Sequence, residues 1–257
     1  MNFELSFVGF LLGIILGSFV KLLADRSLSG ISFGGRSKCP HCGNILNWYD
    51  LIPLLSFIFL QGKCRYCQKK ISFEYPLVEI FTGVLIAMLF SIPQSSANLI
   101  FKTFFISILV AVTVTDLKEM IIPDRVILPS IVIAFIGVLI LSFYPTFNPA
   151  YLVTNVLSGV TFGGFFLLLI IITRGRGMGG GDVKLGAFIG LVLGFPHFLL
   201  AIMLSFLTGA VISIILVFGG KKGLKSTIPF GPFLVLGSLI TLFWGNKIID
   251  WYLKLGS

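Results

Sequence analysis

Long runs of apolar residues, separated by short polar segments, dominate the chain. A helix needs roughly 20 apolar residues to cross the hydrocarbon core of a bilayer, and its backbone must be hydrogen-bonded internally there. The pattern predicts eight candidate spans: 3–23, 76–92, 99–115, 126–144, 151–173, 183–195, 197–218 and 228–245. The sixth is short and ends before Pro196, so we expect a tilted or half-buried helix. The predicted fold class is all-α, a polytopic transmembrane bundle.

Composition supports lipid as the solvent of this chain. Of its 257 residues, 56% are hydrophobic and only 11% are charged, whereas a soluble domain has about a quarter charged residues. The net charge of +9 would suggest nucleic acid in a soluble protein, but membrane proteins gather basic residues in cytoplasmic loops. Residues 3–23 lack the flanks of a cleavable signal peptide and are interpreted as the first span. We expect a lipid bilayer, and no nucleic acid, as partner.

The loops alternate between basic and uncharged, which predicts an orientation. The basic segments are 24–75, 116–125, 174–184 and 219–227, whereas 91–98 and 145–150 carry no charge. By the positive-inside rule the N-terminus lies outside and the four basic segments lie in the cytoplasm. Three parts follow: a first span at 1–24, a small cytoplasmic lobe at 25–75, and a transmembrane bundle at 76–257.

The only four cysteines form two CxxC pairs in the lobe, Cys39 with Cys42 and Cys64 with Cys67. Two such turns can complete a tetrahedron of thiolates around Zn²⁺, and a metal would organise a lobe too small to fold by apolar burial. A redox or disulfide pair is the alternative, which a reducing cytosol disfavours. His41 lies inside the first pair and is interpreted as a bystander, because four thiolates suffice. The site is structural, since it leaves no open coordination position.

Two aspartates lie at predicted cytoplasmic ends of spans. Asp116 ends one apolar run, and Asp182 follows the glycine-rich stretch 177–181. A carboxylate at the membrane edge is a candidate functional residue, and two close carboxyls can share a proton and activate water. Alternatively, Asp182 is a helix N-cap and Asp116 is a solvated residue. Asp124, after Pro123, competes with Asp116 by position, although it is read more naturally as a helix cap.

Other catalytic arrangements find less support. The two histidines are His41 and His197, and His197 lies on the predicted outer side, far from the aspartates, which disfavours a Ser-His-Asp triad. The chain contains no HExxH zinc-protease motif and no GxSxG nucleophile motif.

In these residues the chain resembles the type IV prepilin peptidase family, the GxGD aspartic proteases of bacterial membranes. The resemblance rests on short motifs in a specific order along most of the chain: Gly17-Ser18-Phe19, the two CxxC pairs, Trp48-Tyr49-Asp50 with Ile52-Pro53, Gly62-Lys63-Cys64-Arg65, Tyr75-Pro76-Leu77-Val78-Glu79, Thr115-Asp116-Leu117, Ile122-Pro123-Asp124, Gly177 to Leu185, and Ile228 to Pro232.

The resemblance implies that Asp116 and Asp182 are the catalytic pair. It implies an enzyme of the bacterial inner membrane that acts on prepilin or pseudopilin precursors of pilus or type II secretion systems. It removes a basic leader by cutting after a glycine at the cytoplasmic membrane edge. Many members also N-methylate the new N-terminus with S-adenosylmethionine, for which the sequence identifies no binding residues. Lys21 stands where members often have Asn, a departure that bears on methylation.

Two other classes of function remain open at this stage. A membrane thiol–disulfide oxidoreductase would use the CxxC pairs on an oxidising side of the membrane. An ion-coupled carrier would use the aspartates to relay protons or cations.

Overall fold

The computed structural model describes residues 3–143, 147–175, 178–219 and 228–255, and these residues are mostly helical. Residues 176–177 and 220–227, which belong to the basic and glycine-rich segments, lie outside this part. The elements, in chain order, are α1 (Phe3–Leu28), η1 (Trp48–Leu51), α2 (Leu55–Phe59), α3 (Glu74–Phe90), α4 (Ser96–Glu119), α5 (Asp124–Phe143), α6 (Pro149–Ile172), α7 (Gly180–Leu193), α8 (His197–Phe218) and α9 (Gly231–Leu255).

Each of the eight predicted spans overlaps one helix, and the prediction of an all-α membrane bundle is confirmed. Six of these helices are long and apolar enough to cross a membrane: α1, α4, α5, α6, α8 and α9. The helices α3 and α7 have 17 and 14 residues. At 1.5 Å per residue, α7 is about 21 Å long, which is less than the roughly 30 Å of a hydrocarbon core. The sixth predicted span is therefore a short helix, as its sequence suggested.

Residue contacts divide the chain into two compact units, Met1–Ala111 and Val112–Ser257. The boundary falls within α4, so the end of α4 that carries Asp116 belongs to the second unit. The three-part division at residues 24 and 75 stays a prediction.

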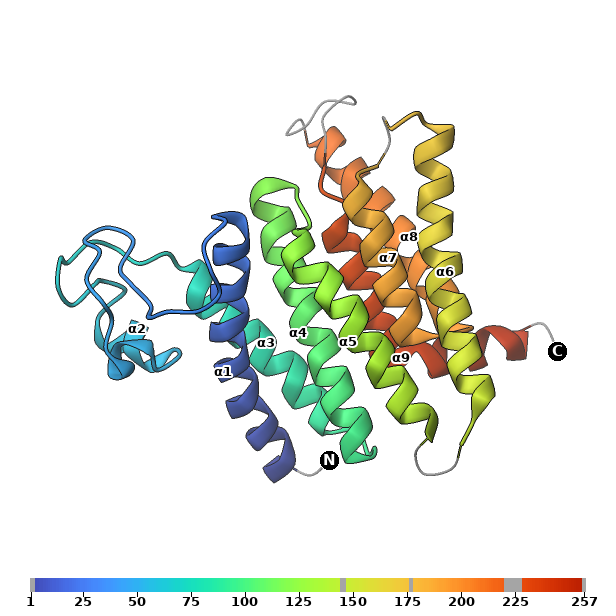
Figure 1. The fold of residues 1–257 in the computed structure, drawn as a ribbon, viewed down its shortest axis with the longest axis horizontal. Coiled ribbons are helices and arrows are strands. Elements are labelled where there is room, and N and C mark those ends of the chain that lie inside the picture. The colour runs from blue at the N-terminus through green and yellow to red at the C-terminus, as the bar shows by residue number, and fades with distance from the viewer. Residues whose placement is uncertain (1–2, 144–146, 176–177, 220–227, 256–257) are drawn as a thin grey trace. The chain divides into compact units, whose positions relative to one another are not determined.

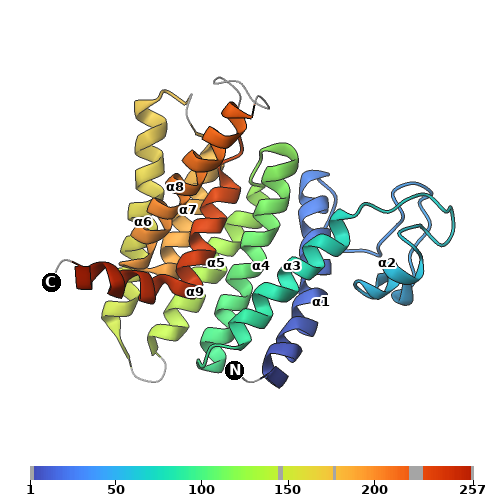
Figure 2. The ribbon, with the colours of Figure 1, turned by 180° about the vertical axis from the view of Figure 1, so that it is seen from behind.

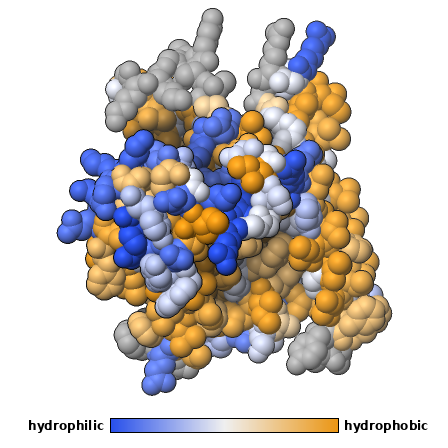
Figure 3. All heavy atoms as spheres, turned by 60° about the vertical axis from the view of Figure 1, so that its left-hand side comes forward, coloured by the Kyte–Doolittle hydropathy of each residue, from blue (hydrophilic) through white to orange (hydrophobic). Residues whose placement is uncertain are grey.

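In the first unit, α1 and α3 pack antiparallel and close together (Figure 1). Glycines make this approach possible, because a Cβ on Gly13 would lie 2.7 Å from the Cα of Gly83, and one on Gly17 would lie 2.8 Å from the Cα of Glu79. Small residues serve this purpose between membrane helices. The lobe between α1 and α3 holds η1, α2 and the cysteines. Hydrophilic side chains gather on the lobe, in contrast to the largely hydrophobic surface of the helices (Figure 3).

In the second unit, α7 packs against α5, α6, α8 and α9. Figure 2 shows the same helices from behind, with α8 and α9 on the near side of α7. Eight of the 14 residues of α7 are buried, which explains how so short a helix is held. Its final turn receives a hydrogen bond of 3.1 Å from the Asn155 side chain to the Leu191 carbonyl. A helix end away from water needs such a donor.

Candidate active site and metal centre

The four cysteines converge in the lobe. Their sulfur atoms all lie within 4.8 Å of one another, and those of Cys39 and Cys67 are 3.9 Å apart. A tetrahedron with Zn–S distances of about 2.3 Å has sulfurs about 3.8 Å apart, whereas a disulfide needs about 2.05 Å. All four thiols are free. The residues therefore fit a metal ion, and His41 is not part of the cluster.

The two CxxC turns share one backbone geometry. Cys39 N–H donates to Asn44 and Cys39 accepts from Gly43; Cys64 N–H donates to Lys69 and Cys64 accepts from Gln68. Short bridges flank both turns, Lys38 with Ile45 and Lys63 with Lys70. Every position in the second turn is 25 residues beyond its equivalent in the first. The lobe thus contains two copies of one turn, each of which presents two cysteines.

A hydrogen-bond network ties the second turn to η1. Arg65, which lies between Cys64 and Cys67, donates to the Asp50 carboxylate at 2.7 Å. Tyr66 donates to the other Asp50 oxygen at 3.3 Å and accepts from the Asn47 side chain at 2.7 Å. The two residues between the cysteines thereby hold the second turn against η1, as groups next to a metal site commonly do.

The two aspartates predicted from the sequence both lie in the second unit, Asp116 in the last turn of α4 and Asp182 in the first turn of α7. Their exposed fractions are 5% and 9%. Both side chains are therefore buried, and Asp116 is not the solvated residue that the alternative interpretation expected. Nor is Asp182 the N-cap of α7: that residue is Gly179, whose N–H donates a hydrogen bond of 3.3 Å to Asp182 Oδ2.

Asp116 is bound by the beginning of α9. The N–H of Gly231 donates a hydrogen bond of 2.9 Å to Asp116 Oδ2. N–H groups in the first turn of a helix have no partner within the helix, and this end of the helix favours negative charge. Sequence reasoning gave Gly231 no role. The sequence does contain an indication of this role. Gly231 stands between Phe230 and Pro232 at the start of a helix, where a backbone N–H has no partner within the helix.

The acid pair is electrostatically coupled. Asp182 lies at the start of α7, outside the six candidate membrane spans. Burial, followed by the charge of the neighbouring Asp116, raises the pKa of Asp182 to about 6. A carboxyl with this pKa is protonated far more often near neutral pH than an ordinary aspartate. The structure therefore brings Asp116 and Asp182 close enough for one to influence the proton of the other.

Asp124 has a different environment. It is the first residue of α5 and is exposed, and its carboxylate forms an ion pair with Lys184 of α7. It thus links the starts of two helices and is not part of the buried pair. Ile122, two residues earlier, packs against the glycine-rich turn, where a Cβ on Gly181 would lie 2.9 Å from the Ile122 Cβ. The motif around Asp124 supports the backbone that carries Asp182.

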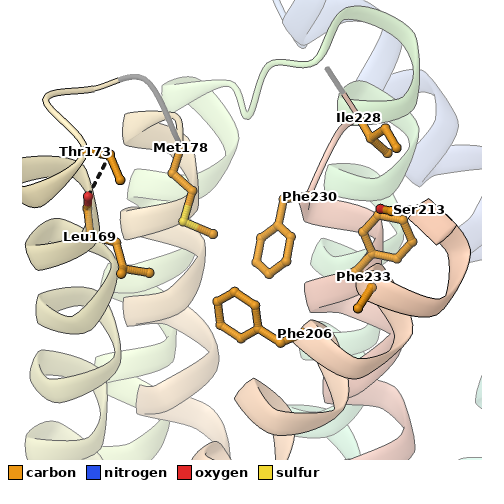
Figure 4. A pocket seen from close by; sticks show the side chains of 10 residues that line it. Leu169, Thr173, Met178, Phe206, Ser213, Ile228, Phe230 and Phe233 are labelled. Carbon is orange, nitrogen blue, oxygen red and sulfur yellow. Dashed lines mark hydrogen bonds between the residues drawn. The ribbon is translucent and has the colours of Figure 1, made fainter. Parts of the chain in front are cut away.

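The second unit contains an apolar groove of about 440 Å³ (Figure 4). Its walls are formed by α6, α8 and the segments that lead into α7 and α9. Phe206 and Phe230 face each other with ring centroids 5.2 Å apart. Two residues that line the groove come directly before the glycines that donate to the aspartates. Met178 precedes Gly179, and Phe230 precedes Gly231. The groove is therefore next, along the chain, to both backbone N–H groups that bind the aspartates.

Comparisons with known proteins identify the family of the chain. Residues 11–92 match the family model of the bacterial peptidase A24 N-terminal domain, and residues 103–214 match that of the type IV leader peptidase family. No solved structure gives a significant match.

Curated relatives cover most of the chain. The protein named prepilin leader peptidase/N-methyltransferase of Bacillus subtilis is 36% identical over 253 residues, which cover 96% of this chain and 97% of the relative. Proteins of the same name from Aeromonas hydrophila and Xanthomonas campestris are each 35% identical; the matches cover 85% of this chain and 74% and 75% of those relatives. The resemblance found in the sequence motifs is confirmed: the chain belongs to the type IV leader peptidase family.

Proposed function

We propose that this protein is a membrane aspartic endopeptidase that removes the leader from prepilin-type precursors and N-methylates the new N-terminus. The observation that carries the peptidase part is the buried, coupled pair Asp116 and Asp182 in a chain of this family. A thiol–disulfide enzyme is disfavoured by four cysteines arranged for a metal. A carrier would not explain the curated relatives, which are named for both cleavage and methylation.

The two carboxyls divide the proton chemistry. Asp116 accepts the shorter backbone hydrogen bond, 2.9 Å from Gly231, which stabilises its ionised form. Asp182, whose pKa is raised to about 6, supplies the proton in the reactive form of the pair. Asp116 takes a proton from water, whose oxygen attacks the scissile carbonyl carbon, while Asp182 donates to the carbonyl oxygen. When the tetrahedral intermediate collapses, the C–N bond breaks, the proton held by Asp116 passes to the leaving amine, and a hydroxyl of the intermediate returns a proton to Asp182.

The groove provides a place for the apolar part of the substrate. A precursor of this class has a basic leader followed by an apolar helix, and the cut lies between them. If the scissile bond lies at the aspartates, the first apolar side chains of the mature part enter the groove beside Phe206 and Phe230. The leader remains in water. The basic loops support an orientation with the lobe and the acid pair on the cytoplasmic side of the inner membrane.

The cysteine cluster is proposed to hold structural Zn²⁺. Four thiolates fill the coordination of the ion, so it would stabilise the lobe and leave no position for a substrate. For methylation, S-adenosylmethionine would supply the methyl group, and we assign no residue of this chain to its binding.

The proposal is tested with purified protein and a candidate prepilin in detergent. Wild type, Asp116→Asn, Asp182→Asn and the matched control Asp124→Asn are compared by the gel shift of leader removal. We expect cleavage by wild type and by Asp124→Asn and none by the other two, with all four chains folded. Full cleavage by either of those two variants would refute the acid pair. Methylation is read separately, from the mass of the mature N-terminus with S-adenosylmethionine present.

A further inference from the structure

The lobe carries an apolar surface that its metal site does not explain. It is formed by η1 and α2, and its most exposed members are Trp48, Ile58 and Phe59, with exposed fractions of 77%, 67% and 81%. Leu51 and Leu55 are exposed on the same two elements. We call these five residues the lobe patch. Large apolar side chains gathered in this way on a polar lobe mark an interaction surface.

A hydrogen bond fixes the depth of the lobe patch relative to α1 and α3. The N–H of Leu54, directly before α2, donates to Glu79 Oε2 at 2.8 Å. Glu79 lies five residues inside α3 from its start at Glu74, a distance of about 7.5 Å along the helix axis. On α1, the matching level is Gly17, which meets the Glu79 backbone. The start of α2 is therefore attached below the lobe-bearing ends of the two helices.

A polar layer lies above this level. Lys21 forms ion pairs with Asp25 at 2.7 Å and with Glu74 at 3.2 Å. Below it, α1 is apolar from Phe7 to Val20 apart from Ser18 and the glycines. The charges indicate where the hydrocarbon core ends, because ionised side chains are costly within it. Figure 1 and Figure 2 show α2 level with the middle of α1, beside the helix.

We infer that the lobe patch is inserted in the bilayer, in the leaflet that surrounds the lobe-bearing ends of α1 and α3. The depth agrees with the 5–10 Å to which interfacial helices bury their apolar face, and tryptophan is typical of that interface. Residues 29–73 contain six basic residues and one acidic residue. Lys63, Lys69 and Lys70 are exposed and suit anionic headgroups. The lobe is thus anchored to the membrane at α2 as well as through the two helices. This inference does not depend on the proposed enzymatic activity.

The first experiment uses Trp48 as a depth probe. Trp244→Phe and Trp251→Phe leave it as the single tryptophan of the chain, in proteoliposomes. Lipids brominated near the headgroup end of the acyl chain should quench Trp48 about as strongly as a lipid-facing reference, Ile214→Trp in a chain without other tryptophans. Iodide in water should quench it several-fold less than it quenches free tryptophan. Strong iodide quenching without bromolipid quenching overturns the inference, and so does protection from both quenchers, which would indicate a protein partner on the patch.

The second experiment uses the unaltered chain. Proteoliposomes that contain a phospholipid with a photoactivatable acyl chain are irradiated, and tryptic peptides are analysed by mass spectrometry. The peptide from Cys39 to Lys63 contains the whole lobe patch, and the peptide ending at Lys21 contains the apolar part of α1. We expect lipid adducts on both, at similar yield and, in the first peptide, within residues 48–59. Adducts confined to the α1 peptide would overturn the inference.

Discussion

The backbone N–H of Gly231 donates a hydrogen bond of 2.9 Å to the Asp116 carboxylate, across 115 residues of sequence. A Cβ at position 231 would lie 2.5 Å from Asp116 Oδ2, so the residue must be glycine if this contact is to form. The start of α9 thereby fixes the position of one carboxyl of the acid pair.

Gly231→Ala should consequently impair cleavage without unfolding the protein. The methyl group pushes the Asp116 carboxylate away, and a displacement of about 1 Å in a catalytic group can reduce the rate by about 10²-fold. We expect this loss in kcat for prepilin cleavage, with little change in KM. Gly164→Ala is the matched control, because a Cβ there meets nothing within 4 Å. Equal rates for the two variants would mean that the Gly231 contact does not orient the acid.

A second pair of glycines tests the turn that carries Asp182. A Cβ on Gly181 would lie 2.9 Å from the Cβ of Ile122, whereas one on Gly180 would meet nothing within 4 Å. Gly181→Ala should therefore destabilise the protein by about 1–3 kcal/mol, as overpacking does, and should reduce cleavage. Gly180→Ala should leave both close to wild type. Thermal unfolding in detergent and the gel-shift assay measure the difference, and the reverse order of the two variants would contradict this packing.

Much of this arrangement was predictable from sequence because it rests on local patterns. Apolar runs predict the long helices, and the CxxC spacing predicts four converging thiols, which Cys39 and Cys67 confirm at 3.9 Å. Asp116 and Asp182 were found because charge at a membrane edge is rare.

Features that depend on packing between distant segments were not predictable in this way. The contact of Gly231 with Asp116 joins α9 to α4, and only the fold brings them together. The pairing of Asp124 with Lys184, which separates Asp124 from the acid pair, is likewise a tertiary contact. The lobe patch was not predictable from sequence because a helix of five residues, Leu55 to Phe59, is too short to show a helical period.

The metal centre makes a prediction that distinguishes ligands from neighbours. Purified wild type should contain one zinc ion per chain, and Cys64→Ser should contain none, because three thiolates and a hydroxyl bind zinc much more weakly. His41→Ala, a change inside the first CxxC turn, should retain the metal. Without metal the segment 25–75 loses its organisation and becomes sensitive to protease. Metal analysis and limited proteolysis measure both effects, and zinc loss in His41→Ala would show that the cluster includes the histidine.

The groove predicts an effect on substrate binding. Ala210 lies in its lining, and Ala210→Trp would fill the space that we assign to the apolar part of the precursor. We expect KM for a prepilin to rise about tenfold, equivalent to about 1.4 kcal/mol of binding free energy, with a small effect on kcat. Val211→Trp, at the next position of α8, which is exposed and outside the lining, should not change KM. If wild type cleaves and both variants have its KM, the groove is not the substrate site, although the acid pair remains supported.

Asp182→Asn should abolish cleavage and yet stabilise the fold, most strongly at high pH. Burial and the Asp116 charge raise the pKa of Asp182 from its usual 3.8 to about 6, so the folded wild type binds more protons than the unfolded chain between these values. The free energy of unfolding of wild type therefore falls as the pH rises through this window. The asparagine variant does not titrate there, so its stability does not fall for this reason. The difference corresponds to about 3 kcal/mol at pH 8 and about half of that at pH 5. Thermal unfolding of both proteins at the two pH values measures it. A variant less stable than wild type at pH 8 would show that the Asp182 carboxylate is not held at a cost to the fold.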